Sequence, residues 1–239
     1  MSSWGQRDRR GRDNSVKVLI FGATGMVGQG VLRECLNAPD VDAVTTIGRT
    51  PVEQTSAKLR QIVHADLADY RGIEEQLRGF DAGFFCLGVS SGGVSEAEYT
   101  RLTHDGTMAA ASVLARLNPD SVFTYVTGAG TDSTERGRVM WARVKGKTEN
   151  ELMKLPFRGV YLFRPGVIQP LHGIKSKTTS YRWFYNVAGP LLPLARAWLP
   201  DVILTTEDMG RAMLAVARAG AGRAVLEAKD IARWARGDR

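Results

Sequence analysis

The stretch Gly22-Ala23-Thr24-Gly25-Met26-Val27-Gly28 decides the fold of this chain. Its G-x-x-G-x-x-G pattern follows the apolar run Val16–Phe21, which is typical of a strand buried on both faces. It leads into apolar residues at helical spacing over 26–36. A chain that leaves a buried strand and turns at once into a helix needs positive φ or a close backbone approach. Glycine supplies both at low cost.

The helix that begins at this turn indicates what the motif could bind. Its unpaired N–H groups and the positive end of its dipole attract a pyrophosphate. The alternative is a tight strand–helix turn that holds no ligand. Because the glycines stand in register after a buried strand, we expect dinucleotide binding, and we expect Gly28 to let the helix pack closely on the sheet. The residues expected to contact the cofactor here are Gly22, Thr24, Gly25, Met26, Val27 and Gly28.

Strands and helices are expected to alternate along the chain. Apolar runs predict strands at Val16–Phe21, 43–47, 59–64, 81–87, 121–127 and 160–163, and helical periodicity predicts helices at 26–36, 70–77, 95–117 and 138–155. Such alternation implies right-handed crossovers and a parallel sheet covered on both faces. The predicted fold class is α/β, a doubly wound parallel sheet (Rossmann fold) with a small C-terminal substrate-cap elaboration.

Three regions are expected within 239 residues, a length that one main hydrophobic core can support. Residues 1–15 are polar and predict a disordered tail, and residues 16–165 form the dinucleotide-binding core. Residues 166–239 form the C-terminal elaboration, packed on the same domain. Within it, a helix is predicted over 205–219 with Thr206 as its N-cap.

The net charge of +7 lies mainly at the chain ends. Residues 1–15 carry four basic and two acidic side chains and residues 211–239 carry seven and three, which leaves 21 basic against 20 acidic groups between them. A basic stripe that binds phosphate backbones should lie on a folded face. Nucleic acid is therefore not expected as a partner.

The cysteines and the apolar segments of the sequence indicate the cellular compartment of the protein. Cys35 and Cys86 make no disulfide framework and are expected to be small buried hydrophobes. The N-terminus lacks the apolar segment of a signal peptide, and the apolar stretch 183–199 is too interrupted to supply the ~20 residues of a spanning helix. We expect a cytoplasmic protein with no integral membrane segment and no metal site.

The end of the second predicted strand discriminates between NAD and NADP. An acidic residue there would receive the ribose hydroxyls of NAD, but this chain has Thr46-Ile47-Gly48-Arg49-Thr50. Arg49 can pair with a 2′-phosphate through its planar fork, whereas the alternative is a surface arginine in a loop. NADP is the predicted cofactor. Asp66, after the third strand, is either an acceptor for the adenine amino group or a helix N-cap.

Together these residues resemble the short-chain dehydrogenase/reductase superfamily. The resemblance covers about residues 16–170 and is greatest to the atypical, extended branch, which includes NAD-dependent epimerase/dehydratases and TIP30-like proteins. It implies that cofactor contacts extend beyond the glycine turn and Arg49, with the nicotinamide beside the Pro-Gly that follows the sixth strand. The further contacts that it implies are Asp66, Leu67, Cys86, Leu87, Gly88, Lys145, Pro165 and Val167.

The resemblance also implies a catalytic signature, a Ser or Thr after the fifth strand and a Tyr-x-x-x-Lys on the next helix. Thr127 matches the first position and Lys145 matches the lysine. In this chemistry a tyrosine hydroxyl, its pKa lowered by the ammonium group, exchanges a proton with the substrate while hydride moves to or from the nicotinamide. Four residues before Lys145, however, stands Trp141.

Trp141 departs from the family pattern, because an indole N–H is a donor only and cannot serve as general acid or base. Three explanations stay open. The helix is wrongly aligned, although residues 141–147 fit the pattern well; or another group substitutes for the tyrosine; or the protein binds NADP(H) without redox chemistry. The candidate substitutes are Tyr125, His172, Tyr181 and Tyr185.

Three hypotheses about function follow. The first is an NADP-dependent oxidoreductase or epimerase that acts on a small, partly apolar substrate with a non-standard proton donor. The second is a non-catalytic NADP(H)-binding regulator or sensor that acts through a protein partner. The third is a peripheral membrane protein that uses the basic and aromatic side chains of residues 171–200. A homodimer is compatible with the alanines at 109–111 and 115, which also suit helix–sheet packing.

Overall fold

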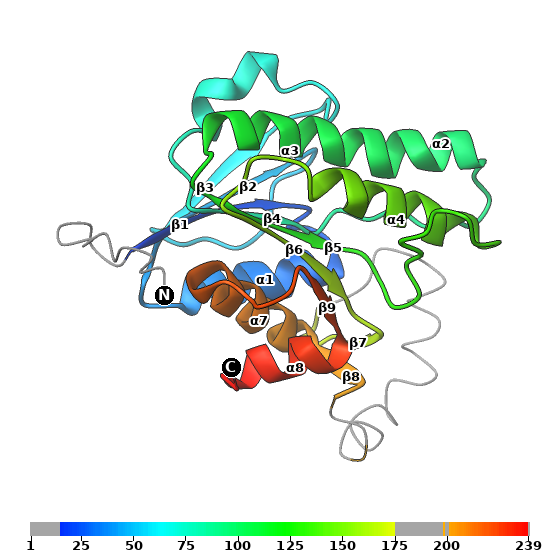
Figure 1. Cartoon of the computed structure of the whole chain (residues 1–239). Coiled ribbons are helices and arrows are strands. Elements are labelled where there is room, and N and C mark those ends of the chain that lie inside the picture. The colour runs from blue at the N-terminus through cyan, green and yellow to red at the C-terminus, as the bar shows by residue number, and fades with distance from the viewer. Residues whose placement is uncertain (1–14, 175–197, 199–200, 239) are drawn as a thin grey trace, which may run out of the picture.

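The computed structural model describes residues 15–174, 198 and 201–238 and centres on a parallel sheet of seven strands (Figure 1). The strand order is β3-β2-β1-β4-β5-β6-β9, so the order reverses between β1 and β4. The strands are β1 (Val16–Phe21), β2 (Val41–Gly48), β3 (Leu59–Val63), β4 (Ala82–Phe85), β5 (Val122–Val126), β6 (Gly159–Arg164) and β9 (Val225–Glu227). A separate pair joins β7 (Val167–Gln169) to β8 (Ile203–Thr205). The predicted doubly wound α/β fold is confirmed.

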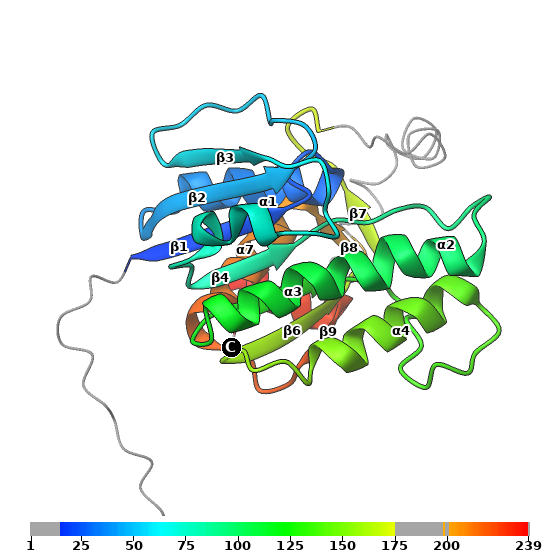
Figure 2. The ribbon, with the colours of Figure 1, turned by 90° about the horizontal axis from the view of Figure 1, so that it is seen from above.

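Helices cover both faces of the sheet. One face carries α1 (Met26–Asn37), α7 (Thr206–Ala219) and α8 (Ala228–Arg236). The other carries η1 (Arg71–Leu77), α2 (Glu96–Thr100), η2 (Arg101–Asp105), α3 (Gly106–Leu117) and α4 (Met140–Leu152). Figure 2 shows α3 and α4 side by side above the sheet. Among the described residues, no helix is long and apolar enough to cross a bilayer.

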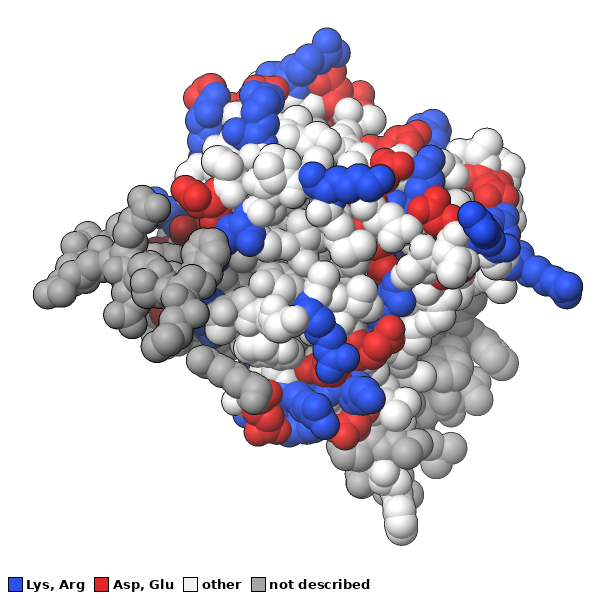
Figure 3. All heavy atoms as spheres, in the orientation of Figure 1, with Lys and Arg blue, Asp and Glu red and all other residues white. Residues whose placement is uncertain are grey.

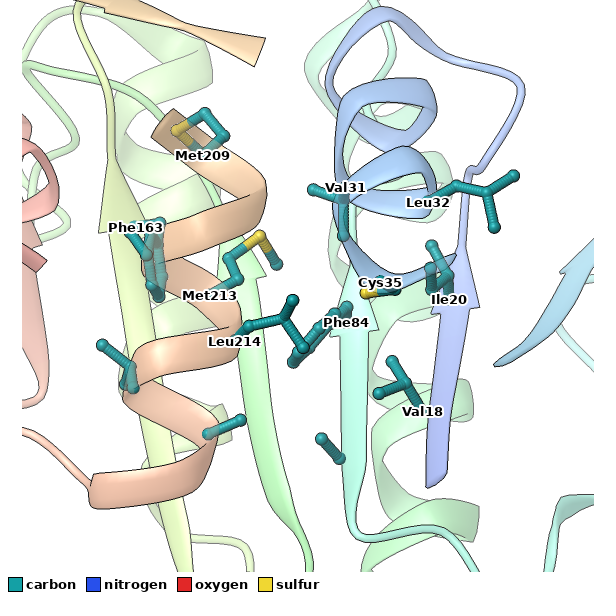
Figure 4. Packing of buried hydrophobic residues seen from close by; sticks show 14 of the residues in the cluster. Val18, Ile20, Val31, Leu32, Cys35, Phe84, Phe163, Met209, Met213 and Leu214 are labelled. Carbon is teal, nitrogen blue, oxygen red and sulfur yellow. The ribbon is translucent and has the colours of Figure 1, made fainter. Parts of the chain in front are cut away.

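Each face of the sheet has its own hydrophobic cluster. Successive side chains of β1 point to opposite faces, so the strand contributes residues to both clusters. Val18 and Ile20 pack with α1 and α7, where Figure 4 shows them beside Cys35. Leu19 and Phe21 pack under α3 and η1. Because both faces of the strand are covered from Val18 onward, residues 18–21 are a continuous apolar run, whereas the exposed Lys17 lies near the start of the strand. The alanines of α3 at 110 and 111 also belong to this second cluster, so they serve helix–sheet packing within the chain.

Several elements differ from the sequence-based expectation. The helix predicted over 95–117 contains a π-helical turn, η2, which places His104 against Glu151 of α4 (Nε2–Oε2 2.9 Å). The N-cap of α7 is Thr205 rather than Thr206, because the Thr205 hydroxyl and the Asp208 carboxylate form a reciprocal capping box. β7, β8 and β9 were not predicted, since a strand of three residues is too short to show periodicity. The helix α8, of nine residues, was overlooked.

Four arginines of the basic segment 211–238 form ion pairs with carboxylates of the fold. Arg211, Arg218, Arg223 and Arg236 form ion pairs with Glu34, Asp40, Asp230 and Asp201, respectively. On the face shown in Figure 3, basic and acidic side chains are interspersed.

Helices α1 and α7 pack closely against each other because each has a glycine at the contact. A Cβ atom on Gly30 of α1 would lie 2.5 Å from the Thr206 carbonyl oxygen at the start of α7. A Cβ on Gly210 of α7 would lie 2.7 Å from the Glu34 side chain. The backbones are therefore closer than any side chain at these positions allows.

Replacing Gly30 by Ala is expected to lower the free energy of unfolding by about 1–3 kcal/mol, because backbone must move to admit the methyl group. Denaturant titration measures this difference. Gly72→Ala is the matched control, since a Cβ at Gly72 meets nothing within 4 Å. Equal losses in both variants would contradict the close helix approach.

Candidate functional site

The glycine turn has the geometry that its sequence predicts. Gly22 adopts φ +78°, and a Cβ there would lie 2.8 Å from the Leu87 backbone nitrogen. A Cβ on Gly28 would lie 2.1 Å from the Gly22 carbonyl oxygen, so Gly28 lets α1 pack against the turn. No side chain caps the N-terminus of α1 at Gly25. The turn therefore presents backbone N–H groups to an anion, as a pyrophosphate site requires.

A cavity of about 1060 Å³ runs past this turn at the carboxyl ends of the strands. It lies where the strand order reverses between β1 and β4, the place where open α/β sheets bind ligands. The predicted cofactor residues that line it are Gly22, Thr24, Gly25, Met26, Val27, Arg49, Leu67, Cys86, Leu87, Gly88, Lys145 and Pro165. Its volume is at the upper limit of typical ligand pockets, about 300–1,000 Å³. The residues present thus fit a dinucleotide.

Arg49 stands at the end of β2 with its side chain exposed. It lines the cavity together with Thr46 and Thr50, and no ion pair joins it to any residue that the structure describes. Most other arginines of the described chain pair with carboxylates. Arg49 is therefore available for an anionic group at this end of the cavity.

Three predicted cofactor residues lie outside the cavity lining. Gly28 lies beneath the turn, and Val167 lies in β7, paired with Ile203. Asp66 is exposed and accepts a hydrogen bond from the Ala68 backbone N–H (2.9 Å). Its carboxylate stabilises the local turn and is not the N-cap of η1, which is Tyr70.

The opposite end of the cavity brings together Thr127, Trp141 and Lys145. Thr127 follows β5, and the other two lie one turn apart on α4. Tyr99 of α2 also lines this end and was missed, because it lies outside every motif. Among the described lining residues the cations are Arg49 and Lys145, and none carries a carboxylate.

Lys145 is partly buried, and its Nζ donates to the Thr127 backbone carbonyl (2.9 Å). Burial lowers the pKa of its ammonium group to about 8, while the charge of Glu149 acts in the opposite direction. Both protonation states of Lys145 are therefore populated near neutral pH.

Thr127 is held by a buried ion pair behind it. Its hydroxyl donates to Oε1 of Glu149 (2.7 Å), a carboxylate that is 1% exposed. The Arg164 guanidinium forms a bidentate contact with the same carboxylate and also donates to the Ser133 hydroxyl (2.6 Å). Glu149 follows Lys145 by four residues on α4, a spacing that could have identified it, whereas nothing local pointed to its pairing with Arg164.

The two predicted proton donors that the structure describes, Tyr125 and His172, do not line this end of the cavity. Tyr125 is 1% exposed and packs in the core, and burial raises the pKa of its hydroxyl. His172 lines a separate cavity of about 300 Å³, and its ring contacts the Glu207 carboxylate. Tyr181 and Tyr185 lie outside the described residues, as do residues 175–197 and 199–200 of the predicted cap over 171–200.

The cysteines show no reactive environment. Both are free thiols, as expected, and burial raises the pKa of Cys86 to about 12. Within the described part of the chain, no three His, Cys, Asp or Glu side chains cluster as metal ligands do.

Residues 18–137 match the model of the NAD dependent epimerase/dehydratase family. Among curated proteins, Protein FMP52-2, mitochondrial, from Scheffersomyces stipitis is 29% identical over 151 residues, which cover 62% of this chain and 65% of that protein. Protein HTATIP2 from Rattus norvegicus is 26% identical over 199 residues, 78% of this chain and 81% of that protein. The crystal structure of WbmH from Bordetella bronchiseptica in complex with NAD+ shares the fold, with a TM-score of 0.63, 16% identity, and coverage of 89% of this chain and 74% of that one.

The relatives contradict the expectation of a cytoplasmic protein. The FMP52 proteins of Scheffersomyces stipitis, Candida albicans and Debaryomyces hansenii are all named mitochondrial. The cytoplasmic expectation rested on the missing apolar segment at the N-terminus, a feature that bears on secretory export alone.

Replacing Glu149 by Ala removes the buried carboxylate that binds the Arg164 guanidinium through two contacts and leaves it, among the described carboxylates, only the longer contact with Glu227 (3.5 Å). The free energy of unfolding is expected to fall by about 3–5 kcal/mol, measured by denaturant titration. Glu75→Ala is the control, because the Glu75–Arg78 pair is exposed and such pairs contribute about 0–1 kcal/mol. A loss no larger than that of the control would contradict the role of the buried pair.

Replacing Lys145 by Met removes a buried charge and should stabilise the fold at pH 7 by about 1–2 kcal/mol. Below about pH 8 the lysine is protonated in both the folded and the unfolded chain, so the cost of burial is fully present. Between about pH 8 and the ordinary lysine pKa of 10.5, only the unfolded chain keeps the proton, so the free energy of unfolding of the wild type rises with pH. The stability difference between Lys145→Met and the wild type therefore becomes smaller over this range. Denaturant titrations at pH 7, 8.5 and 10 measure it, with the exposed Lys147→Met as control. A difference that grows with pH would contradict the lowered pKa.

Proposed function

Because the chain belongs to the NAD dependent epimerase/dehydratase family, in an atypical branch of the short-chain dehydrogenases/reductases, we propose that it is an NADP(H)-dependent oxidoreductase or epimerase. Its substrate is small and partly apolar, and its proton donor is not the usual tyrosine. One observation carries the proposal: Thr127 and Lys145 line the same cavity as the glycine turn and Arg49.

The cofactor would lie along this cavity. The turn at 22–28 would hold the pyrophosphate at the N-terminus of α1, and Arg49 would pair with the 2′-phosphate. Leu67 would contact the adenine end, Cys86 to Gly88 the ribose, and Lys145 and Pro165 the nicotinamide end. When bound, the nicotinamide supplies or accepts a hydride.

The far end of the cavity suits a neutral or anionic substrate with apolar surface. Trp141 and Ile168 supply apolar surface there, and Ser90 and Ser91 supply hydroxyl groups. With Lys145 as the cation and no lining carboxylate in the described residues, nothing there would pair with a cationic substrate.

A second candidate function is a non-catalytic NADP(H)-binding regulator or sensor that acts through a protein partner. Trp141 favours it, because an indole cannot transfer the proton that the usual tyrosine transfers. The cofactor site itself supports both functions equally.

Consumption of NADPH with a panel of aldehydes, ketones and quinones distinguishes the two functions. The first predicts turnover by the wild type that Thr127→Ala and Lys145→Ala reduce, with the exposed Lys147→Ala as control. If NADPH binds with micromolar affinity but no member of the panel is turned over, the regulator is favoured.

Arg49→Ala is expected to weaken binding of NADPH by about 10–100-fold and to leave binding of NADH unchanged. A charge-assisted pair with the 2′-phosphate contributes about 1.5–3 kcal/mol, and NADH lacks that phosphate. Titration calorimetry measures both affinities, with Arg60→Ala as control, since Arg60 lies outside the cavity and bonds to Gln76. Equal weakening of both cofactors would contradict NADP selection by Arg49.

A further inference from the structure

We propose that Lys145 itself transfers the proton to and from the substrate oxygen, in place of the tyrosine that Trp141 replaces. The inference rests on the proposed oxidoreductase function and names the missing proton donor of that site. Its basis is geometric: among the described residues at this end of the cavity, Lys145 presents an ionisable Nζ, and the Thr127 hydroxyl, the other group of the expected signature, donates to Glu149.

The Thr127 hydroxyl donates its hydrogen bond to Glu149. Its proton points at Oε1 of a carboxylate that is 1% exposed and that Arg164 binds from the other side. While that pair is intact, Thr127 offers only lone pairs to the cavity and cannot donate to a carbonyl oxygen. Glu149 and Arg164 are positioning residues in this arrangement, because they act through Thr127 and line no part of the cavity.

The remaining ionisable groups around Lys145 are Glu149 on its own helix, Arg164 of β6 behind Glu149, Cys86 after β4 and Tyr99 of α2. Burial holds the Cys86 thiol protonated, with a pKa of about 12, so it neither releases nor exchanges a proton near neutral pH. Tyr99 is 2% exposed and lies on the opposite helix. It is the competing donor that the experiment must test.

The surroundings of Lys145 suit an acid that works near neutral pH. Its Nζ has one donor engaged by the Thr127 carbonyl, which leaves ammonium protons for the cavity. Trp141, one turn earlier on α4, adds an apolar wall beside it. With a pKa of about 8, the group can both give and regain a proton at physiological pH.

The step balances as an ordinary carbonyl reduction. The carbonyl carbon of the substrate receives a hydride from the reduced nicotinamide, and its π electron pair moves to oxygen. That oxygen forms an O–H bond with a proton from Lys145 Nζ, which becomes a neutral amine and regains a proton from solvent. The carbonyl is reduced to an alcohol and the nicotinamide is oxidised.

The first test needs no substrate. Acetic anhydride labels neutral amines, so peptide mass spectrometry across pH 6–11 gives the titration midpoint of Lys145, with the exposed Lys147 as internal reference. We expect a midpoint near pH 8 and protection of Lys145 by NADP+. A midpoint above pH 10, or labelling that NADP+ does not alter, overturns the proposal.

The second test separates Lys145 from Tyr99 by kinetics. With a carbonyl substrate, Lys145→Met and Lys145→Arg are expected to lose at least about 10²-fold in kcat. Lys145→Arg should keep the KM for NADPH within about threefold, because the cation is retained. Wild-type kcat for reduction should fall above about pH 8 as the ammonium is lost, and Lys147→Met should match the wild type.

Two outcomes would overturn the assignment. Turnover that survives in Lys145→Met and disappears in Tyr99→Phe assigns the proton to Tyr99 and leaves the proposed function intact. A wild type that binds NADPH but turns over no carbonyl overturns the proposed function together with this inference. Circular dichroism of each variant shows that the losses do not come from unfolding.

Discussion

The structure depends on one close backbone approach, that of Gly28 in α1 to the Gly22 carbonyl at the end of β1. A Cβ atom on Gly28 would lie 2.1 Å from that oxygen, so no residue with a side chain lets α1 begin so near the strand. The approach aims the N-terminus of α1 at the cavity and brings the turn against Leu87 after β4. The N-terminus of α1, which can bind an anion, therefore lies at the place where the strand order reverses between β1 and β4.

A buried charge pair has the corresponding role at the other end of the cavity. Arg164 at the end of β6 binds Glu149 on α4, and the same carboxylate accepts the Thr127 hydroxyl proton after β5. Burying two charges costs desolvation energy, so such a pair is weak evidence for stability. Its effect here is positional, because it fixes α4, and with it Lys145, against the ends of two strands.

The sequence predicted the longer strands of the central sheet and missed the strands of three residues, the π-helical turn and the nine-residue helix α8. β1 has the expected bounds, Val16–Phe21, because its covered residues, 18–21, are all apolar. The π-helical turn η2 has no periodicity of its own, and β9 is only three residues long. Thr205 and Thr206 are the same residue type, so only the hydrogen bonds of the capping box identify the N-cap of α7.

The sequence by itself determined what depends on local spacing: the glycine turn at 22–28, Arg49 with no carboxylate at the end of β2, and Lys145 four residues after a tryptophan. The cavity that joins them and the direction of the Thr127 hydroxyl proton were decided by the tertiary structure alone. A motif records the spacing of side chains along one strand or helix. Which atoms meet across elements depends on how the sheet and α4 pack, and the bond from Thr127 to Glu149 spans 22 residues of chain that no local pattern describes.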